Sequence, residues 1–172
     1  MPQPWSKPLA VDRLSREAAV LAFDIAVTQL PRVSSRVELL GGRVQGRVRF
    51  GRDAHRAVAE VTLEGEVQLR CQRCMRPMAL PLSARTSVAL LGSAHEADAL
   101  SGAFEPVLAR EGRISVAELV EEEVLLSLPI VPMHAEQPQC RPLEQTGPAE
   151  QQPAEAATQR PFAGLGKLLS QK

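Results

Sequence analysis

The residues best suited to chemistry are two cysteines, Cys71 and Cys74, that bracket the short sequence CQRC. Two thiols at this spacing in a tight turn can both face one soft cation. His134 and Cys140 follow about sixty residues later and can complete a tetrahedral set, if the fold returns the chain to the cysteine turn. The spacing therefore indicates a zinc site made of three cysteines and one histidine.

The same cysteines have two other interpretations. In the first, Cys71 is a small buried hydrophobic residue, Cys74 is a free thiol, and Cys140 belongs to a disordered tail. In the second, the pair is redox active. A redox pair normally begins a helix, whose dipole lowers the pKa of the first thiol, whereas Pro77 and Pro81 here lead into a strand. The sequence disfavours the redox interpretation and leaves the choice between zinc ligands and free thiols open.

Arrangements typical of catalysis do not emerge from the sequence. The three histidines, His55, His95 and His134, lie in a turn, a polar loop and a segment after a proline, so no catalytic triad can be argued. The glycine-rich stretch GGRVQGRVRFG falls within strand-like sequence and matches neither a P-loop nor a dinucleotide-binding fingerprint. We therefore expect a protein that binds other molecules and is not an enzyme.

Charge and composition narrow the class of partner. The 172 residues carry 20 basic and 20 acidic side chains, so no net charge draws the whole molecule to a polyanion. Aromatic residues make up only 3% of the chain, too few for a platform on which bases stack. Residues 32–76 contain ten arginines and five acids, whereas residues 96–123 contain eight acids and two arginines. This asymmetry predicts either an RNA-facing and a protein-facing side or two ordinary solvated faces.

Arginines on the exposed faces of predicted strands are the candidates for RNA contact. Each can neutralise a phosphate if neighbouring strands present them on one surface, although an ordinary charged sheet face is the alternative. Two of them flank the cysteine turn, which would hold them more firmly than a free loop does. The predicted RNA-binding residues are Arg47, Arg49, Arg70, Arg73 and Arg76.

Alternating apolar and polar residues predict the strands that position these groups. Residues 44–50 alternate with arginines outward, and residues 59–71 form the clearest alternating run, in which Cys71 falls on the buried face. Residues 80–90 alternate in the same way after the cysteine turn. Consecutive strands joined by short turns indicate an antiparallel sheet or small open barrel. A helical segment over residues 14–22 is expected from its alanine, glutamate and leucine content.

A better-defined helix is predicted over residues 116–128. Ser115 and Glu118 form a capping box at its start, and a proline ends it. Its apolar stripe faces the core, while Glu121 and Glu122 lie mostly on the other side. Adjacent helical residues diverge by about 100°, so the run Glu121, Glu122 and Glu123 is better explained by a solvated face than by paired catalytic acids.

Composition divides the chain into three parts. Residues 1–134 are expected to form a single α+β domain, an antiparallel sheet or small open barrel packed with one well-capped helix. Residues 135–160 are rich in Pro, Gln and Glu and poor in large apolar side chains, so burial cannot offset their ordering entropy and a disordered linker is expected. Residues 161–172 form a short docking segment, in which one face of a helix carries Phe162, Leu165 and Leu168.

The cellular compartment follows from the amino terminus and the cysteines. The first residues lack the basic stretch, apolar run and cleavage site of a secretory signal, and no apolar run approaches the roughly 18 residues of a membrane span. Three cysteines suit thiols or metal ligands better than a disulfide framework. We expect a cytoplasmic protein.

Three stretches, in order, resemble the YceD family, known as the large ribosomal RNA subunit accumulation proteins: LRCQRCMRPMALPL, then FEPVLAREGRISVAELVEEEVLLSLPIVPMH, then RPFAGLGKLL beyond Cys140. The resemblance spans residues 60–140 and returns in the last dozen residues. It implies a bacterial or organellar protein needed for normal accumulation of large-subunit ribosomal RNA, with no established catalytic activity. It also places His134 and Cys140 in the same recurring set as the cysteine turn, which strengthens the zinc prediction.

Two functions are consistent with the residues and the resemblance. The first is a non-catalytic ribosome biogenesis factor that supports 23S rRNA accumulation and large-subunit assembly, with arginines on ribosomal RNA and a second surface on a basic ribosomal protein. The second is a zinc-stabilised protein–protein interaction module without direct RNA contact. Neither involves a membrane or a small-molecule substrate. The predicted partner-binding residues are Glu121, Glu122, Phe162, Leu165 and Leu168.

Overall fold

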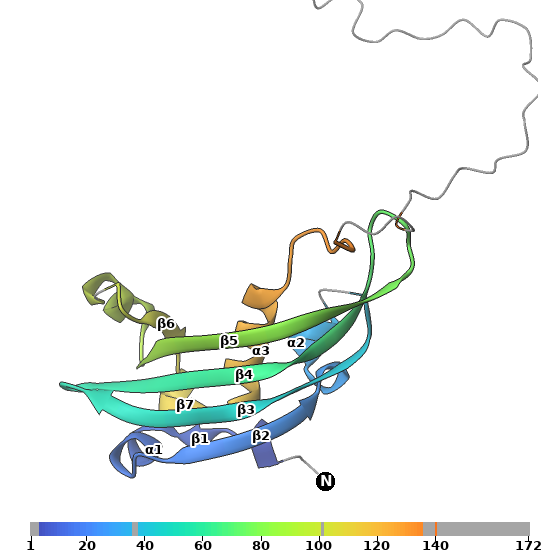
Figure 1. The fold of residues 1–172 in the computed structure, drawn as a ribbon. Coiled ribbons are helices and arrows are strands. Elements are labelled where there is room, and N and C mark those ends of the chain that lie inside the picture. The colour runs from blue at the N-terminus through green and yellow to red at the C-terminus, as the bar shows by residue number, and fades with distance from the viewer. Residues whose placement is uncertain (1–3, 36–37, 101, 136–139, 141–172) are drawn as a thin grey trace, which may run out of the picture. The chain divides into compact units, whose positions relative to one another are not determined.

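Three long strands form the framework of the molecule in the computed structural model, which describes residues 4–35, 38–100, 102–135 and 140 (Figure 1). These are β3 (Leu39–Asp53), β4 (Arg56–Arg70) and β5 (Pro77–Leu91). The other strands are β1 (Leu9–Ala10), β2 (Val20–Ala26), β6 (Glu105–Leu108) and β7 (Arg113–Ile114). The α-helices are α1 (Val11–Arg16), α2 (Pro31–Ser34) and α3 (Val116–Ser127). The 3₁₀ helices are η1 (Pro4–Ser6), η2 (Val27–Gln29), η3 (Ala94–Ala99) and η4 (Arg110–Gly112).

The main sheet has five strands in the order β2-β3-β4-β5-β6. The first four are antiparallel neighbours, whereas β6 joins β5 in parallel. A second, two-stranded sheet pairs β1 with β7. The α+β prediction is therefore confirmed, and of its two forms the open sheet is correct for the part of the chain that the structure describes. The alternating patterns did not predict the parallel pairing of β6, because the chain first passes through η3 before it reaches the sheet edge.

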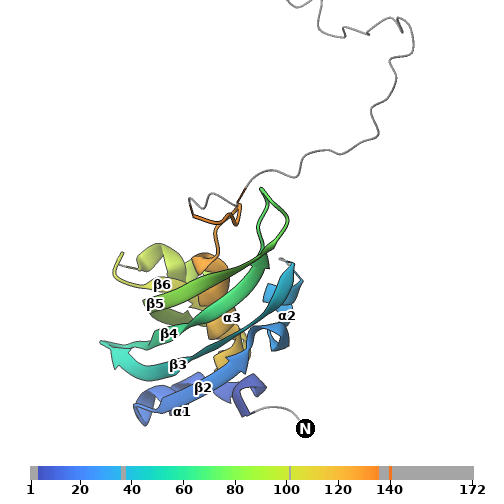
Figure 2. The ribbon, with the colours of Figure 1, turned by 45° about the vertical axis from the view of Figure 1, so that its right-hand side comes forward.

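Side-chain alternation along the long strands follows the sequence pattern. Val44, Val48 and Phe50 of β3 and Val61 and Leu63 of β4 are buried, each 2% exposed or less. They form one hydrophobic core with the apolar stripe of α3, which lies across one face of the sheet (Figure 2). The burial of this face leaves the opposite face of the sheet for polar residues.

The capping box at the start of α3 is confirmed. Ser115 Oγ accepts a hydrogen bond from the Glu118 backbone N–H at 3.2 Å, and the Glu118 carboxylate accepts from the Ser115 backbone N–H at 2.7 Å. Leu119, Val120 and Val124 are buried on its apolar stripe. Because the capping box fixes its first turn, α3 begins at a defined residue and packs in one register against β4 and β5.

The prediction of a helix over residues 14–22 is wrong after Arg16. The helical segment α1 ends at Arg16, Ala18 adopts a left-handed φ of 47°, and β2 begins at Val20. All seven residues of β2 pair with β3, and this places Phe23 and Ile25 in the core. Sheet pairing and burial thus override the weak helix preference of the local composition.

The chain separates into two units, Met1–Pro142 and Leu143–Lys172, of which the second lies outside the described residues. The predicted linker over 135–160 lies outside them too, except for Ala135 and Cys140. Cys140 is only 8% exposed and belongs to the core cluster of the first unit. In the described segments, no helix is both long and apolar enough to cross a membrane.

Candidate metal centre

The cysteine turn connects the end of β4 to the start of β5 and is closed by its own backbone. The Cys71 N–H donates to the Arg76 carbonyl at 2.9 Å, and the Met75 N–H donates to the Cys71 carbonyl at 2.8 Å. Met75 adopts a left-handed φ of 57°, which reverses the chain within the turn. These contacts point the side chains of Cys71 and Cys74 to the inside of the turn, where they are 0% and 2% exposed.

The segment that follows α3 returns to the cysteine turn, which is the condition for a site made of all four residues. The Gln72 N–H donates to the Pro132 carbonyl at 2.8 Å, and this hydrogen bond holds the returning segment against the turn. Two residues later, His134 places Nδ1 at 3.5 Å from Cys74 Sγ and Nε2 at 3.2 Å from the Pro77 carbonyl oxygen. The imidazole is thus held from both sides.

The ligand atoms of Cys71, Cys74, His134 and Cys140 all lie within 4.8 Å of one another. Cys71 Sγ and Cys140 Sγ are 3.6 Å apart, and Cys74 Sγ and His134 Nδ1 are 3.5 Å apart. Among the residues that the structure describes, this is the one group of at least three His, Cys, Asp or Glu side chains that could hold a metal ion. The four residues that the spacing predicted are therefore brought together.

The two separations given above fit a tetrahedral ion. With Zn–S bonds of about 2.3 Å and Zn–N bonds of about 2.0 Å, tetrahedral angles place two sulfurs about 3.8 Å apart and a sulfur and a nitrogen about 3.5 Å apart. If Nδ1 is the ligand, then Nε2–H is free to donate to the Pro77 carbonyl, which is the outer contact that usually orients a metal-binding histidine. Three soft thiolates and one imidazole suit zinc better than a hard cation.

The protonation of the cysteines also favours metal binding. Burial opposes ionisation of Cys71, but backbone N–H groups of His134, Cys74 and Arg73 donate to its sulfur and lower its pKa to about 5. For Cys74, the Arg76 backbone N–H favours the thiolate, yet burial and the nearby sulfurs of Cys71 and Cys140 raise its pKa. Adjacent thiolates repel one another, and a divalent cation removes that repulsion.

Arg73 is part of this cluster, a role that the sequence did not reveal. Its Nε donates to Cys140 Sγ at 3.2 Å, and its terminal nitrogen donates to the His134 carbonyl at 3.0 Å. The hydrogen bond to Cys140 raises the pKa of Arg73 above its usual value. The guanidinium thus ties the two late ligands to the turn that carries the two early ones, and it neutralises part of the thiolate charge.

The other predicted RNA contacts form two separate groups on the sheet. Arg47 and Arg49 lie near the middle of β3, opposite Thr62 and Glu60 of β4, whereas Arg70 ends β4 eight residues beyond Thr62 and ten beyond Glu60. At the usual rise per residue the separation along the strand is about 26 to 33 Å. The five arginines therefore do not share one compact patch.

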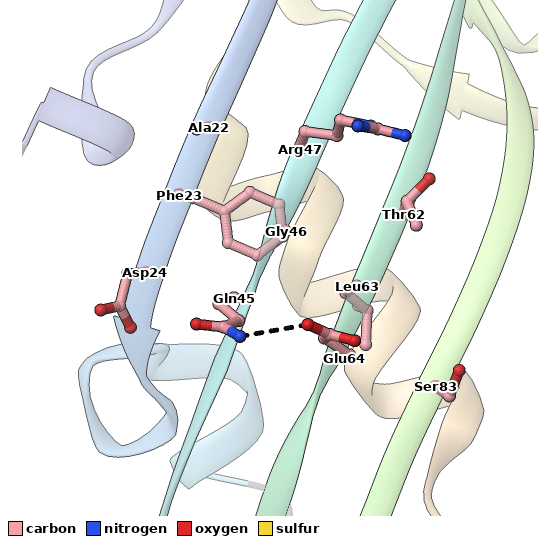
Figure 3. Close-up of a pocket in the computed structure, with 10 residues that line it drawn as sticks. All are labelled: Ala22, Phe23, Asp24, Gln45, Gly46, Arg47, Thr62, Leu63, Glu64 and Ser83. Carbon is pink, nitrogen blue, oxygen red and sulfur yellow. Dashed lines mark hydrogen bonds between the residues drawn. The ribbon is translucent and has the colours of Figure 1, made fainter.

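The group on β3 lies in a mixed surface. A hydrogen bond from Arg85, with the nearby charges of Arg49 and Arg47, lowers the pKa of Glu60. Beside it lies a hollow of about 500 Å³ over β2, β3 and β4, where Arg47 extends toward Thr62 and Gln45 donates to Glu64 at 3.1 Å (Figure 3). Its charged lining residues are Asp24, Glu64 and Arg47, and none of them belongs to the candidate group of metal ligands.

The group at the cysteine turn is more strongly basic. Arg70 pairs with Glu38 at 2.8 Å and also donates to the Met75 carbonyl at 3.0 Å. Arg76 is exposed, and its side chain forms no hydrogen bond or ion pair with any described residue. We call Arg70, Arg73 and Arg76 the arginine tip.

The acidic side of α3 differs from the expected solvated face. Glu121 is only 4% exposed, and its carboxylate accepts the Arg32 backbone N–H at 2.9 Å. Glu122 is half-buried and pairs with the Arg32 guanidinium at 2.7 Å. Glu123 is 8% exposed. The prediction of a solvated face is thus wrong for Glu121 and Glu123, because α2 and the sheet edge cover this part of the helix. The remaining predicted contacts, Phe162, Leu165 and Leu168, lie outside the described residues.

Comparison with known proteins gives one consistent match. The family model described as "Large ribosomal RNA subunit accumulation protein YceD" matches residues 59–169. A curated protein of Haemophilus influenzae, "Large ribosomal RNA subunit accumulation protein YceD", is 31% identical over 169 residues, which cover 94% of this chain and 95% of that protein. No solved structure gives a significant match. The matched region contains the strand that leads into the cysteine turn, the turn itself, α3 and all four candidate ligands.

Proposed function

This chain belongs to the YceD family of large ribosomal RNA subunit accumulation proteins, and from that premise we propose that it supports accumulation of 23S rRNA and assembly of the large subunit by binding. In this proposal the protein holds ribosomal RNA with its arginines and a ribosomal protein with its acidic side, and it transforms neither. The observation that supports it best is the arginine tip, where a rigid turn presents basic side chains beside the cluster of cysteines and histidine.

A zinc ion held by Cys71, Cys74, His134 and Cys140 is the second part of the proposal. The donor set, its burial and the separations of its atoms fit a structural site, in which four protein ligands leave no open position for a substrate. When bound, the ion would supply rigidity and charge neutralisation. The turn and the segment after α3 would then be fixed to each other, and with them Arg73.

RNA contact at the arginine tip predicts a defined dependence on salt. Arg76→Ala should weaken binding of the purified chain to 23S rRNA fragments about tenfold near 0.1 M salt and reduce the slope of log affinity against log salt by about 1, because one phosphate contact is lost. Arg76 is the suitable position because its side chain has no partner among the described residues, so the variant should keep the fold. The measurement is a filter-binding or fluorescence titration at several salt concentrations.

A matched control comes from an arginine far from the tip. Arg13 on α1 is exposed and pairs only with Glu17 at 3.2 Å, so Arg13→Ala removes the same charge without touching the turn. The double variant Arg47→Ala, Arg49→Ala tests the second group in the same titration. Equal affinity and equal salt slope for the wild-type protein and Arg76→Ala would reject RNA binding by the tip.

The alternative function is a zinc-stabilised module that contacts proteins alone. It is favoured by the burial of the three cysteines of the ligand set and by the acidic residues around α3, which would repel RNA phosphates. Sedimentation with assembling large subunits separates the two. The alternative predicts that the chain still sediments with these particles after the arginines of the tip and of β3 are replaced, whereas the leading proposal predicts its release.

A further inference from the structure

A cleft between α3 and the β6 edge of the sheet is lined by a carboxylate that has no basic partner among the described residues. The cleft has a volume of about 290 Å³, and Glu123 lines it together with Glu122 and Glu105. Glu123 is 8% exposed as a residue, yet no hydrogen bond or ion pair reaches its carboxylate from any described residue. A carboxylate held on a largely buried side chain attracts a cationic group, and the described part of the chain supplies none.

The other glutamates of α3 make the contrast clear, since each has a partner in the chain. Glu118 closes the capping box with Ser115, at 2.7 Å from its backbone nitrogen. The carboxylate of Glu121 accepts the Arg32 N–H, and that of Glu122 pairs with the Arg32 guanidinium. Among the glutamates of α3, Glu123 is the one whose carboxylate has no partner among the described residues, and it lines the cleft.

The walls of the cleft are apolar and suit a long basic side chain. Val61, Val88 and Leu126 line it beside the carboxylates. Lysine and arginine bury their methylene stems along such surfaces and keep the charged group at a polar end. A volume of about 290 Å³ lies at the low end for small-molecule sites, so one inserted side chain fits better than a whole ligand. The carboxylates do not form a group close enough to share a metal ion.

The open edge of β6 offers a place for the chain that carries this side chain. The Ala109 N–H donates to the Leu91 carbonyl at 2.8 Å. In a strand, neighbouring residues direct their backbone N–H and C=O groups to opposite sides, so residues 106 and 108 of β6 direct theirs away from β5. Pro106 is one of them, and its missing N–H therefore costs no sheet hydrogen bond. Leu108 is the other, and its backbone N–H and carbonyl face the open edge beside the cleft.

We propose that this cleft is the docking site for an extended protein segment that inserts a lysine or arginine side chain toward Glu123. The inference rests on the proposed function as a binding protein and names the chemistry of its protein partner. RNA is excluded as the occupant because the cleft presents carboxylates to it.

A peptide titration tests the site directly. The probe is a fluorescently labelled Val-Arg-Val-Arg-Val peptide, titrated into the full chain and followed by polarisation. Saturable binding to the wild-type protein is expected, weakened at least about tenfold by Glu123→Gln, because a buried charge-assisted contact is lost. Glu17→Gln, which removes an exposed carboxylate on the far side of the fold at α1, should bind like wild type. A Val-Gln-Val-Gln-Val peptide should not bind.

Melting curves show whether the variant is folded. Glu123→Gln keeps the shape of the side chain, so without peptide it should melt within a few degrees of wild type. The peptide should raise the melting temperature of the wild-type protein and leave that of Glu123→Gln unchanged. Equal peptide affinity of the two proteins would overturn the proposal.

Two other outcomes would also overturn it. Spermidine or free arginine binding as tightly as the peptide would show a site for small cations, and dimerisation abolished by Glu123→Gln would show that a second copy fills the cleft. The RNA titration of Arg76→Ala is independent of these results. If Glu123→Gln behaves like wild type while Arg76→Ala loses RNA affinity, the cleft is rejected and RNA binding stands; the reverse pattern rejects the arginine tip and leaves the cleft.

Discussion

Replacing Cys74 by serine should remove zinc from the protein and lower its melting temperature by about 10 °C. The purified wild-type chain is expected to carry one zinc ion, and a chelator should lower its melting temperature by a similar amount. The reason is geometric, because Cys74 Sγ and His134 Nδ1 are 3.5 Å apart and belong to two segments that are sixty residues apart in the sequence. Elemental analysis gives the zinc content, and circular dichroism gives the melting curve.

The histidines supply the matched control for this experiment. His134→Gln should lose zinc as Cys74→Ser does, whereas His55→Gln replaces an exposed imidazole at the turn between β3 and β4 and should change neither zinc content nor melting. Cobalt substituted for zinc should give the intense visible bands of a tetrahedral thiolate site. A chain purified under reducing conditions that contains no metal, binds no added zinc and melts identically with chelator would reject the metal site.

Replacing Gly46 by alanine should destabilise the fold by about 3 kcal/mol, with a fall in melting temperature of about 10 °C. A Cβ at this position would lie 2.0 Å from the Thr62 carbonyl oxygen and 3.0 Å from Phe23 Cζ. Gly46 lies on β3 between β2 and β4, and the Phe23 ring extends over it (Figure 3). Relief of the clash requires movement of the β4 backbone, which cannot shift without disturbing β5 as well.

A second glycine of the same strand is the control for Gly46. At Gly51 a new Cβ would meet only Val58 Cγ2, at 4.0 Å, which is an ordinary contact. Gly51→Ala should therefore leave stability unchanged or raise it slightly, since alanine loses less conformational entropy on folding. Equal melting temperatures for the two variants would contradict the close approach of β3 and β4 at Gly46. Chemical denaturation gives the free energy of unfolding for each.

The strands and α3 could be predicted because local pattern and tertiary environment agree there. A strand with one buried face repeats every two residues, and β4 does so from Ala59 to Cys71 without interruption. The capping box of α3 depends on Ser115 and Glu118 alone, and both are visible in sequence. The segment 14–22 lacked this agreement. Its helix preference was weak, and pairing of β2 with β3 determined its structure.

The ligand set could be predicted, but its surroundings could not. Cysteine and histidine spacing names Cys71, Cys74, His134 and Cys140, because few residue types bind zinc. The position of Arg73 between the two halves depends on the path of the chain after α3, which no local pattern encodes. Arg73 thus also contacts the cluster, and its contact with RNA stays a prediction.

The positions of the charges needed the register of the sheet. Sequence places the arginines of β3 and of the tip on exposed faces, but only the pairing of β3 with β4 shows that the first group lies near the middle of a long strand and the second at its end. Glu121 and Glu123 were expected to face solvent because the helix pattern is amphipathic. The structure buries both, since α2 and the sheet edge extend the core around α3. A charged residue on a helix therefore indicates an exposed position only where no other element packs against that side of the helix.

The order in which the ribosome makes this chain determines when the cluster of cysteines and histidine can form. Cys71 and Cys74 are synthesised early, but the fourth ligand exists only after residue 140, when every strand of the sheet and α3 have been made. Two thiols alone hold a metal weakly, so tight capture of the proposed zinc ion would be the last event in the maturation of the domain. Metal content would therefore distinguish finished molecules from nascent or interrupted ones in a mixed population.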